Sequence, residues 1–299
     1  MKIPRAADDR PRATTASPRA TAAFPLPPAA PSQAAAAPPR AAADGSRPAV
    51  DRLCHTTGLL LVLSGLLHLV VFAADGGPWD GPVSWRKPVT FGLSFGVTLI
   101  AVTWVTSYLR PGPAERSART TERLRSVLLL VFAADCVVEV GGITLQAWRR
   151  VPSHLNMETP FDTAVSMTLA VGGGVLVVLL TVFAALSFRH RPAGPAGMPL
   201  AVRSGFALLL VALVSGAVMI ARGVFLTRTG HQEAAYHSTA PLKPLHGVSL
   251  HAVLVLPLLA RLLSRTPWSE QVRRRIVAVA VGCYTAAVVA AVVWAVLTY

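Results

Sequence analysis

Charged side chains are scarce in this sequence: they make up only 14% of its 299 residues, against roughly 25% in soluble globular proteins. Apolar residues account for 53%, and the mean hydropathy is +0.53. A net charge of +14 suggests nucleic-acid binding only when the cations lie on a solvated, polar surface. Here they lie between long apolar runs that would not remain in water. The composition therefore excludes a soluble nucleic-acid-binding protein and predicts an integral membrane protein whose main partner is the lipid bilayer.

Cysteine is also scarce. The three cysteines, Cys54, Cys136 and Cys283, are widely separated in the sequence. This number and spacing predict neither a disulfide framework nor a thiolate metal site.

The first 50 residues differ in composition from the rest. They contain 17 alanines and 10 prolines, and a segment of this kind cannot bury enough apolar surface to offset its ordering entropy. It also lacks the continuous apolar core of a secretory signal. We therefore expect a disordered tail over residues 1–50 and a separate membrane domain over residues 51–299.

Seven apolar runs follow the tail, each close to the ~20 residues that an α-helix needs to cross a bilayer. None of them has the short alternating pattern of transmembrane barrel strands. The sequence therefore predicts an all-α, seven-transmembrane-helix bundle. The expected helices are 53–74, 88–109, 125–147, 163–188, 201–226, 245–263 and 275–297.

Lysine and arginine are distributed unevenly between the two ends of these helices. The tail through Arg52 and the alternate loops 110–125, 189–203 and 261–275 hold 21 of the 28, which leaves seven for the other end. Cytoplasmic loops are enriched in these residues. We therefore expect the N-terminus in the cytoplasm and the C-terminus on the outer side of the cell membrane.

The expected outer loops carry the most distinctive motifs. Tryptophan and arginine are common at the headgroup level of a membrane, but this does not account for a histidine and an asparagine beside them. The Thr-Pro-Phe-Asp motif at 159–162 predicts a helix start, with Thr159 as its N-cap. We expect these loops to bind the headgroup of a lipid or small amphiphile. The candidate binding residues are Trp85, Arg86, Lys87, Trp148, Arg149, Asn156 and Asp162.

Three motifs together resemble a family of uncharacterised multi-pass membrane proteins from actinobacteria. They are Trp85-Arg86-Lys87-Pro88, the stretch from Ser153-His154-x-Asn156 to Thr159-Pro160-Phe161-Asp162, and His246-Gly247-x-x-x-His251 followed by Leu256-Pro257. The resemblance covers roughly residues 55 to 263. It implies a multi-pass protein of a bacterial cytoplasmic membrane, and no established activity comes with it.

Ionisable side chains within the apolar runs are costly in a membrane, and each therefore indicates a functional site. A rise of about 1.5 Å per residue places most of them in the outer half of the bilayer. Asp135 and Glu139 are four residues apart and so share one helix face. Two such carboxylates in a low dielectric cannot both stay charged without compensation by a proton, an arginine or a metal ion. The full set is His68, Asp135, Glu139, Arg222 and His251, with His246 at a helix end.

The first functional hypothesis is a metal-dependent enzyme that acts on a lipid or amphiphile from the outer leaflet. Zinc, iron or manganese would be held by His68, Glu139, His246 and His251, which supply suitable nitrogen and oxygen ligands. The catalytic residues would be Asp135, Glu139, His154 and Arg222, with a metal-activated water as nucleophile. The motif Ser64-x-x-x-His68, followed by Asp135 and the late pair His246 and His251, is similar in residue type to the superfamily of alkaline ceramidases and adiponectin receptors. It differs in that the late histidines of that superfamily are four residues apart and its Ser-x-x-x-His motif is not on the first helix.

Two other hypotheses fit the same residues. In a proton-coupled carrier, Asp135 and Glu139 would bind the proton, with His68 and His251 as relays. In a b-type haem protein, His68 and His251 would be the axial ligands. The sequence leaves the enzyme, the carrier and the haem protein open.

Overall fold

The computed structural model describes residues 49–109, 118–190 and 192–298, and within these ranges all regular secondary structure is helical. Seven of the described helical segments are long and apolar enough to cross a membrane, which confirms the predicted all-α bundle of seven transmembrane helices. The long helices are α1 (Ala49–Asp75), α2 (Arg86–Thr106), α3 (Ala118–Trp148), α4 (Pro160–Arg189), α5 (Met198–Arg228), α7 (Lys243–Leu263) and α8 (Glu270–Thr298).

Six of the seven predicted spans lie inside an observed α-helix, and the span 88–109 covers most of α2 and the short helix η1 that follows it. The observed helices begin a few residues earlier than predicted. The extension is largest at α3, which begins at Ala118, because polar residues continue the helix beyond its apolar run. Two short helices, α6 (Gln232–His237) and η2 (Ala240–Leu242), precede α7 and were not predicted, and η1 (Ser107–Leu109) continues α2. The predicted disordered tail lies outside the described residues except for Ala49 and Val50, which already belong to α1.

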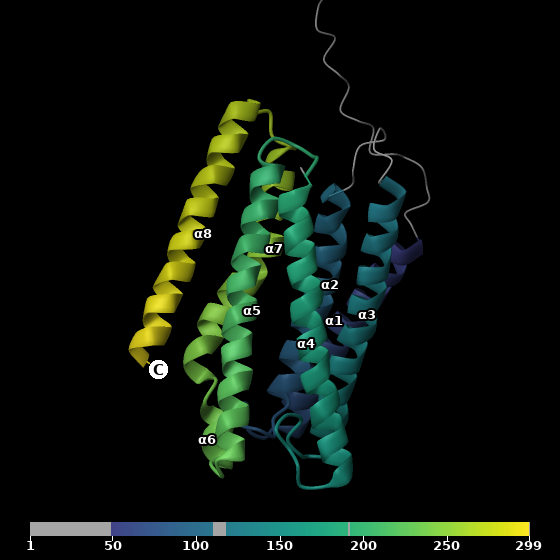
Figure 1. The fold of residues 1–299 in the computed structure, drawn as a ribbon, viewed down its shortest axis with the longest axis vertical. Helices are drawn as coiled ribbons and strands as arrows, with labels where there is room; N and C mark the ends of the chain where they lie inside the picture. The colour runs from purple at the N-terminus through teal and green to yellow at the C-terminus, as the bar shows by residue number, and fades with distance from the viewer. Residues whose placement is uncertain (1–48, 110–117, 191, 299) are drawn as a thin grey trace, which may run out of the picture. The chain divides into compact units, whose positions relative to one another are not determined.

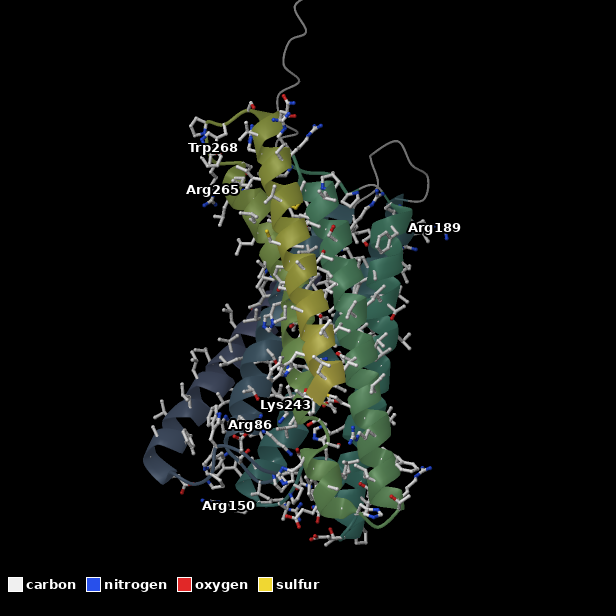
Figure 2. The ribbon with its side chains drawn as sticks, turned by 90° about the vertical axis from the view of Figure 1, so that its left-hand side faces the viewer. Arg86, Arg150, Arg189, Lys243, Arg265 and Trp268 are labelled. Carbon is white, nitrogen blue, oxygen red and sulfur yellow. The ribbon has the colours of Figure 1, made fainter. Side chains whose placement is uncertain are left out.

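Successive long helices run in opposite directions, so their connections gather at two ends of the bundle (Figure 1). We call the end at which α1 finishes and α2 and α7 begin the Trp85 end, and the opposite end the Arg125 end. Arg86, Arg150 and Lys243 lie toward the Trp85 end, whereas Arg189 and Arg265 lie at the other (Figure 2). The uneven distribution of lysine and arginine among the loops predicts the same alternation of helix ends.

Glycines set the packing of α1 against α2. A Cβ atom built on Gly96 of α2 would lie 2.5 Å from the carbonyl oxygen of Gly58 of α1, and one on Gly92 would lie 2.8 Å from the Cα of Gly65. Gly92 and Gly96 form a Gly-x-x-x-Gly pattern, which lets helix backbones approach closely in membranes. Only glycine fits at this contact without a shift of the helices.

Helix α5 packs closely on α7, and α8 lies at one side of the bundle (Figure 1). A Cβ on Gly205 of α5 would lie 2.9 Å from the Cα of Val253 of α7. On α8, only Val277, Val288 and Ala295 are buried, so most of its apolar surface is left for lipid.

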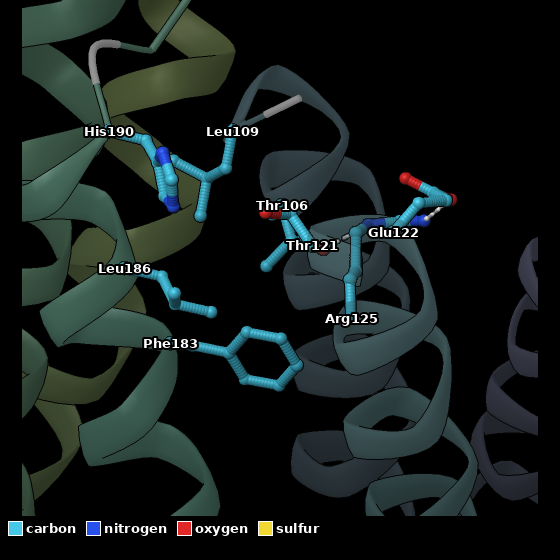
Figure 3. A pocket seen from close by; sticks show the side chains of 8 residues that line it. All are labelled: Thr106, Leu109, Thr121, Glu122, Arg125, Phe183, Leu186 and His190. Atoms are coloured by element: carbon cyan, nitrogen blue, oxygen red, sulfur yellow. Dashed lines mark hydrogen bonds and ion pairs between the residues drawn. The ribbon is translucent and has the colours of Figure 1, made fainter. Parts of the chain in front are cut away.

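A buried arginine joins three helices at the Arg125 end. The Arg125 side chain is 4% exposed. It donates from Nη2 to Asp51 Oδ1 of α1 at 2.8 Å and to the Thr103 carbonyl of α2 at 3.1 Å. It also donates from Nη1 to Glu122 at 3.0 Å and from Nε to Thr106 at 3.2 Å. The sequence counts Arg125 among the loop cations, whereas the structure places it inside α3 as a link between α1, α2 and α3. Figure 3 shows its side chain beside Thr106 and Glu122.

The link continues toward α4. A cavity of about 10 Å³, about the size that holds one water molecule, adjoins Arg125 and Glu122. Phe183, Leu186 and His190 of α4 line its other side (Figure 3). Four helices thus meet around this guanidinium.

Replacing Arg125 by methionine should destabilise the bundle by about 3–5 kcal/mol, because removing one partner of a buried ion pair leaves the other charge poorly compensated. The measurement is the free energy of unfolding in detergent. The exposed neighbour Arg123 provides the matched control, and R123M should have little effect. Equal losses in R125M and R123M would contradict a structural role for the Arg125 network.

Candidate functional site

The polar motifs of the Trp85 end bind mainly to one another. Trp85 Nε1 donates to Asp75 Oδ2 at 2.6 Å, and Arg150 forms an ion pair with the same carboxylate at 2.9 Å. The Arg150 guanidinium also lies 5.6 Å from the centre of the Trp85 ring. Trp85, predicted to bind a ligand, is buried. It instead ties the loop after α1 to the end of α3.

His68 of α1 is held by bonds at both ring nitrogens. Nδ1 lies 2.7 Å from the Ser64 carbonyl oxygen, and Trp148 Nε1 donates to Nε2 at 3.1 Å. An indole N–H can only donate and a carbonyl can only accept, so the hydrogen is on Nδ1 and the ring is neutral. Both nitrogens are occupied, and His68 and Trp148 therefore pack α1 against α3.

Asp162 is the centre of a second network. Its side chain accepts from Thr159 Oγ1 at 2.6 Å and from Gln146 Nε2 at 2.9 Å, and it forms an ion pair with Arg149. Thr159 in turn accepts from the Asp162 backbone N–H at 3.1 Å, which confirms the predicted N-cap with Pro160 at the first turn of α4. Arg149 and Asp162, both predicted to bind a ligand, neutralise one another.

The loop between α3 and α4 is fixed by buried polar contacts. The Asn156 backbone N–H donates to Ser166 Oγ at 3.1 Å, and Ser166 Oγ donates back to the Asn156 carbonyl at 3.0 Å. Asn156 Oδ1 accepts from the Glu158 backbone N–H at 3.1 Å. Arg150 and Leu155 adopt positive φ values of 60° in this loop. Asn156 thus has a structural role in shaping the loop.

His154 belongs to the same loop, and its side chain packs against α2. Its ring centre lies 6.1 Å from that of Phe91, and its Nδ1 lies 2.9 Å from Ser153 Oγ. Burial, assisted by the positive charge of Lys87, lowers the pKa of His154 to about 4. His154 is therefore neutral at neutral pH.

The two acids of α3 lie together inside the bundle, against α4. A Cβ on Gly172 would contact Glu139 Oε1 and would lie 2.9 Å from Asp135 Oδ1, so both carboxylates face the same glycine. Glu139 is 3% exposed. Glu139 Oε1 and Asp135 Oδ2 are buried and have no hydrogen-bond partner, and neither residue forms an ion pair within the described ranges. These carboxylates are the candidate functional site.

The remaining predicted residues lie elsewhere. His246 lies against α5, with Nδ1 2.9 Å from the Ala212 carbonyl oxygen, and His251 lies on the exposed surface of α7, with Nδ1 2.6 Å from the Gly247 carbonyl oxygen. Arg222 is partly buried on α5. Among the described residues, no three His, Cys, Asp or Glu side chains are grouped so that they could hold a metal ion. The predicted ligands His68, Glu139, His246 and His251 are therefore not brought together, because each histidine is directed to a different partner.

Two residues of the site region were not recognised from the sequence. Gly172 belongs to a run of three glycines, and the sequence alone does not show which of the three faces α3. Lys243 was counted only as a loop cation, although it begins α7. A helix start that coincides with a lysine is the signal that could have identified it.

The chain matches no protein-family model, no curated protein and no solved structure.

Acidification should destabilise the protein through His154. Since its folded-state pKa of about 4 lies below the ordinary value of 6.5, the unfolded chain binds more protons between these values, and stability falls as the pH is lowered through this window. The melting temperature should therefore decrease from pH 7 to pH 4 more in the wild type than in H154N. The exposed His231 is the control, and H231N should retain the full decrease. Identical pH profiles for the wild type and H154N would show that His154 is not responsible.

Proposed function

We propose that this integral membrane protein is a proton-coupled carrier, with Asp135 and Glu139 as its proton-binding site. The observation that carries the proposal is the pair of carboxylates against Gly172, each with a buried oxygen that has no partner. An ionised carboxylate in an apolar environment is strongly disfavoured without a compensating charge, and two adjacent ones more so. The pair is therefore expected to hold at least one proton.

The position of the pair fits a proton site within a bilayer. Glu139 precedes Trp148 by nine residues on α3, which is about 14 Å along the helix axis, and Asp135 lies one turn deeper. If the Trp85 end faces outward, as the loop cations predict, a proton from that side must pass the level of the buried His68 side chain, which is bonded to Trp148. Movement of α4 against α3 at the glycines is the simplest way to open such a path.

The same observations favour the carrier over the other two hypotheses. His68 has no free ring nitrogen for a metal ion or a haem iron, and His251 lies on the exposed surface of α7 with Nδ1 near the Gly247 carbonyl oxygen. Asp135 and Glu139 retain unsatisfied oxygens and, within the described ranges, belong to no group of three His, Cys, Asp or Glu side chains that could hold a metal ion. A proton is the ligand that such a pair can bind without further protein groups.

A lipophilic carbodiimide tests the protonated state, because it adds covalently to a protonated carboxyl group in an apolar environment. The purified protein should be modified at Glu139 at neutral pH, as mapped by mass spectrometry of peptides, and less so at high pH. Modification should disappear in E139Q and remain in E233Q, which changes an exposed acid of α6.

A second test compares substitutions at two glycines of α4, neither of which removes a charge. In G172A the added methyl would contact the Glu139 carboxyl group, whereas nothing lies within 4 Å of a Cβ on Gly174. G172A should therefore reduce the rate of carbodiimide modification and G174A should not. Unchanged modification in both E139Q and G172A would overturn the assignment of the proton site.

Carrier function also requires that protonation changes the conformation of the bundle. Cys136 is fully buried beside Asp135, and Cys283 is exposed on α8. The maleimide labelling rate of Cys136, relative to that of Cys283, should depend on pH in the wild type and lose that dependence in E139Q. If the ratio has the same pH dependence in both proteins, proton binding is not coupled to motion of the helices and the carrier proposal fails.

A further inference from the structure

Some cations of the Trp85 end are neutralised within the protein, and others are not. Arg149 pairs with Asp162 and Arg150 with Asp75. Arg86 lies 3.3 Å from Asp80, but the Asp80 side chain is 83% exposed, and exposed pairs of this kind contribute little. The acids of this end therefore leave positive charge uncompensated around Arg86.

Two lysines lie beside Arg86. Lys87 follows it at the start of α2, and Lys243 begins α7, which packs against α2. The charges of Arg86 and Lys243 both act on Lys87, and Lys243 is affected by the positive charge of Arg86 and, in the opposite sense, by the negative charge of the exposed Asp80. In the described part of the chain, the side chain of neither lysine forms a hydrogen bond or an ion pair. Arg86 and Lys243 lie at the same level of the bundle (Figure 2), so three cations form one group, which we call the Lys87 cluster.

Three features of the Lys87 cluster favour an anionic ligand. Like charges held together repel one another, and a bound anion would relieve that repulsion. The first turns of α2 and α7 add the positive ends of two helix dipoles. Lys87 is partly buried, and a partly desolvated ammonium gains more from an anion than one in water does.

The neighbours of the cluster indicate a ligand at the headgroup level. Arg86 Nε donates to the Trp79 carbonyl at 3.1 Å, and Trp79 is exposed, as is usual for tryptophans at a membrane interface. His154, which the charge of Lys87 affects, is neutral at neutral pH. It therefore adds no fourth cation and no negative charge that would compete with an anion.

We propose that Arg86, Lys87 and Lys243 bind a phosphate group, supplied either by an anionic lipid headgroup or by free phosphate. Arginine and lysine form strong charge-assisted hydrogen bonds with phosphate oxygens. This inference is independent of the proposed proton site, because none of its three residues contacts Asp135 or Glu139 through a bond in the described structure.

The test is thermal unfolding of the full chain purified in a neutral detergent. Dioleoylphosphatidylglycerol and dioleoylphosphatidylcholine are added in separate samples, and inorganic phosphate is compared with chloride at equal ionic strength. A ligand that binds the folded state raises the melting temperature, and at a given concentration a tighter ligand raises it more. Stabilisation by phosphatidylglycerol but not by phosphatidylcholine, whose phosphate is neutralised by its choline, would identify an anionic lipid headgroup. Stabilisation by inorganic phosphate over chloride would identify the free anion.

Variants assign the effect to the cluster. K87Q and K243Q should each weaken the apparent affinity by on the order of tenfold. R228Q should leave it unchanged, because it removes an exposed cation of the same end from α5. If K87Q does not fold, K243Q carries the test, since Lys243 is exposed at the first residue of its helix. Equal behaviour of K243Q and R228Q, or no preference for either phosphate ligand over its control, would overturn the proposal.

Discussion

The structure depends on one constraint: a polar group inside a bilayer must find its partner within the protein, since no water is present to replace it. Arg125 meets this constraint through α1, α2 and its own helix. His68 meets it with Trp148, and Asp162 with Thr159, Gln146 and Arg149. These networks lie near the two ends of the bundle, where they fix how the helices enter and leave the membrane.

In the middle of the bundle, the helices are held together by close packing at glycines. There the backbones themselves approach closely, through Gly58 and Gly96 between α1 and α2 and through Gly205 between α5 and α7. Gly172 uses the same absence of a side chain to make room for two carboxylates. Those carboxylates have oxygens without hydrogen-bond partners. In this they differ from the polar side chains of the networks near the two ends of the bundle, which have partners. Such departures are expected at functional sites.

Much of the fold could be predicted from the sequence because its signals are local. The length of an apolar run is sufficient to identify a transmembrane helix, and Thr159-Pro160-Phe161-Asp162 is a helix start within four residues. The partners of Asp75 and His68 could not be predicted, since Arg150 and Trp148 are 75 and 80 residues away. Residues at the same depth on different helices can also point in different directions around their helix axes, and the sequence does not determine these directions. For that reason His68, His246 and His251, although correctly expected near the Trp85 end, do not converge on one metal ion.

We propose separate roles for different parts of the molecule. The networks around Arg125 and Asp162 hold the helices of the bundle together. In our proposal, the Lys87 cluster binds an anion at one membrane surface and the carboxylate pair binds a proton between the surfaces. The most direct test of this central claim is infrared difference spectroscopy of the protein between neutral and alkaline pH. The account predicts a carbonyl stretching band of a protonated carboxylic acid at neutral pH that is absent from E139Q. The same band in E139Q, or no such band in the wild type, would contradict it.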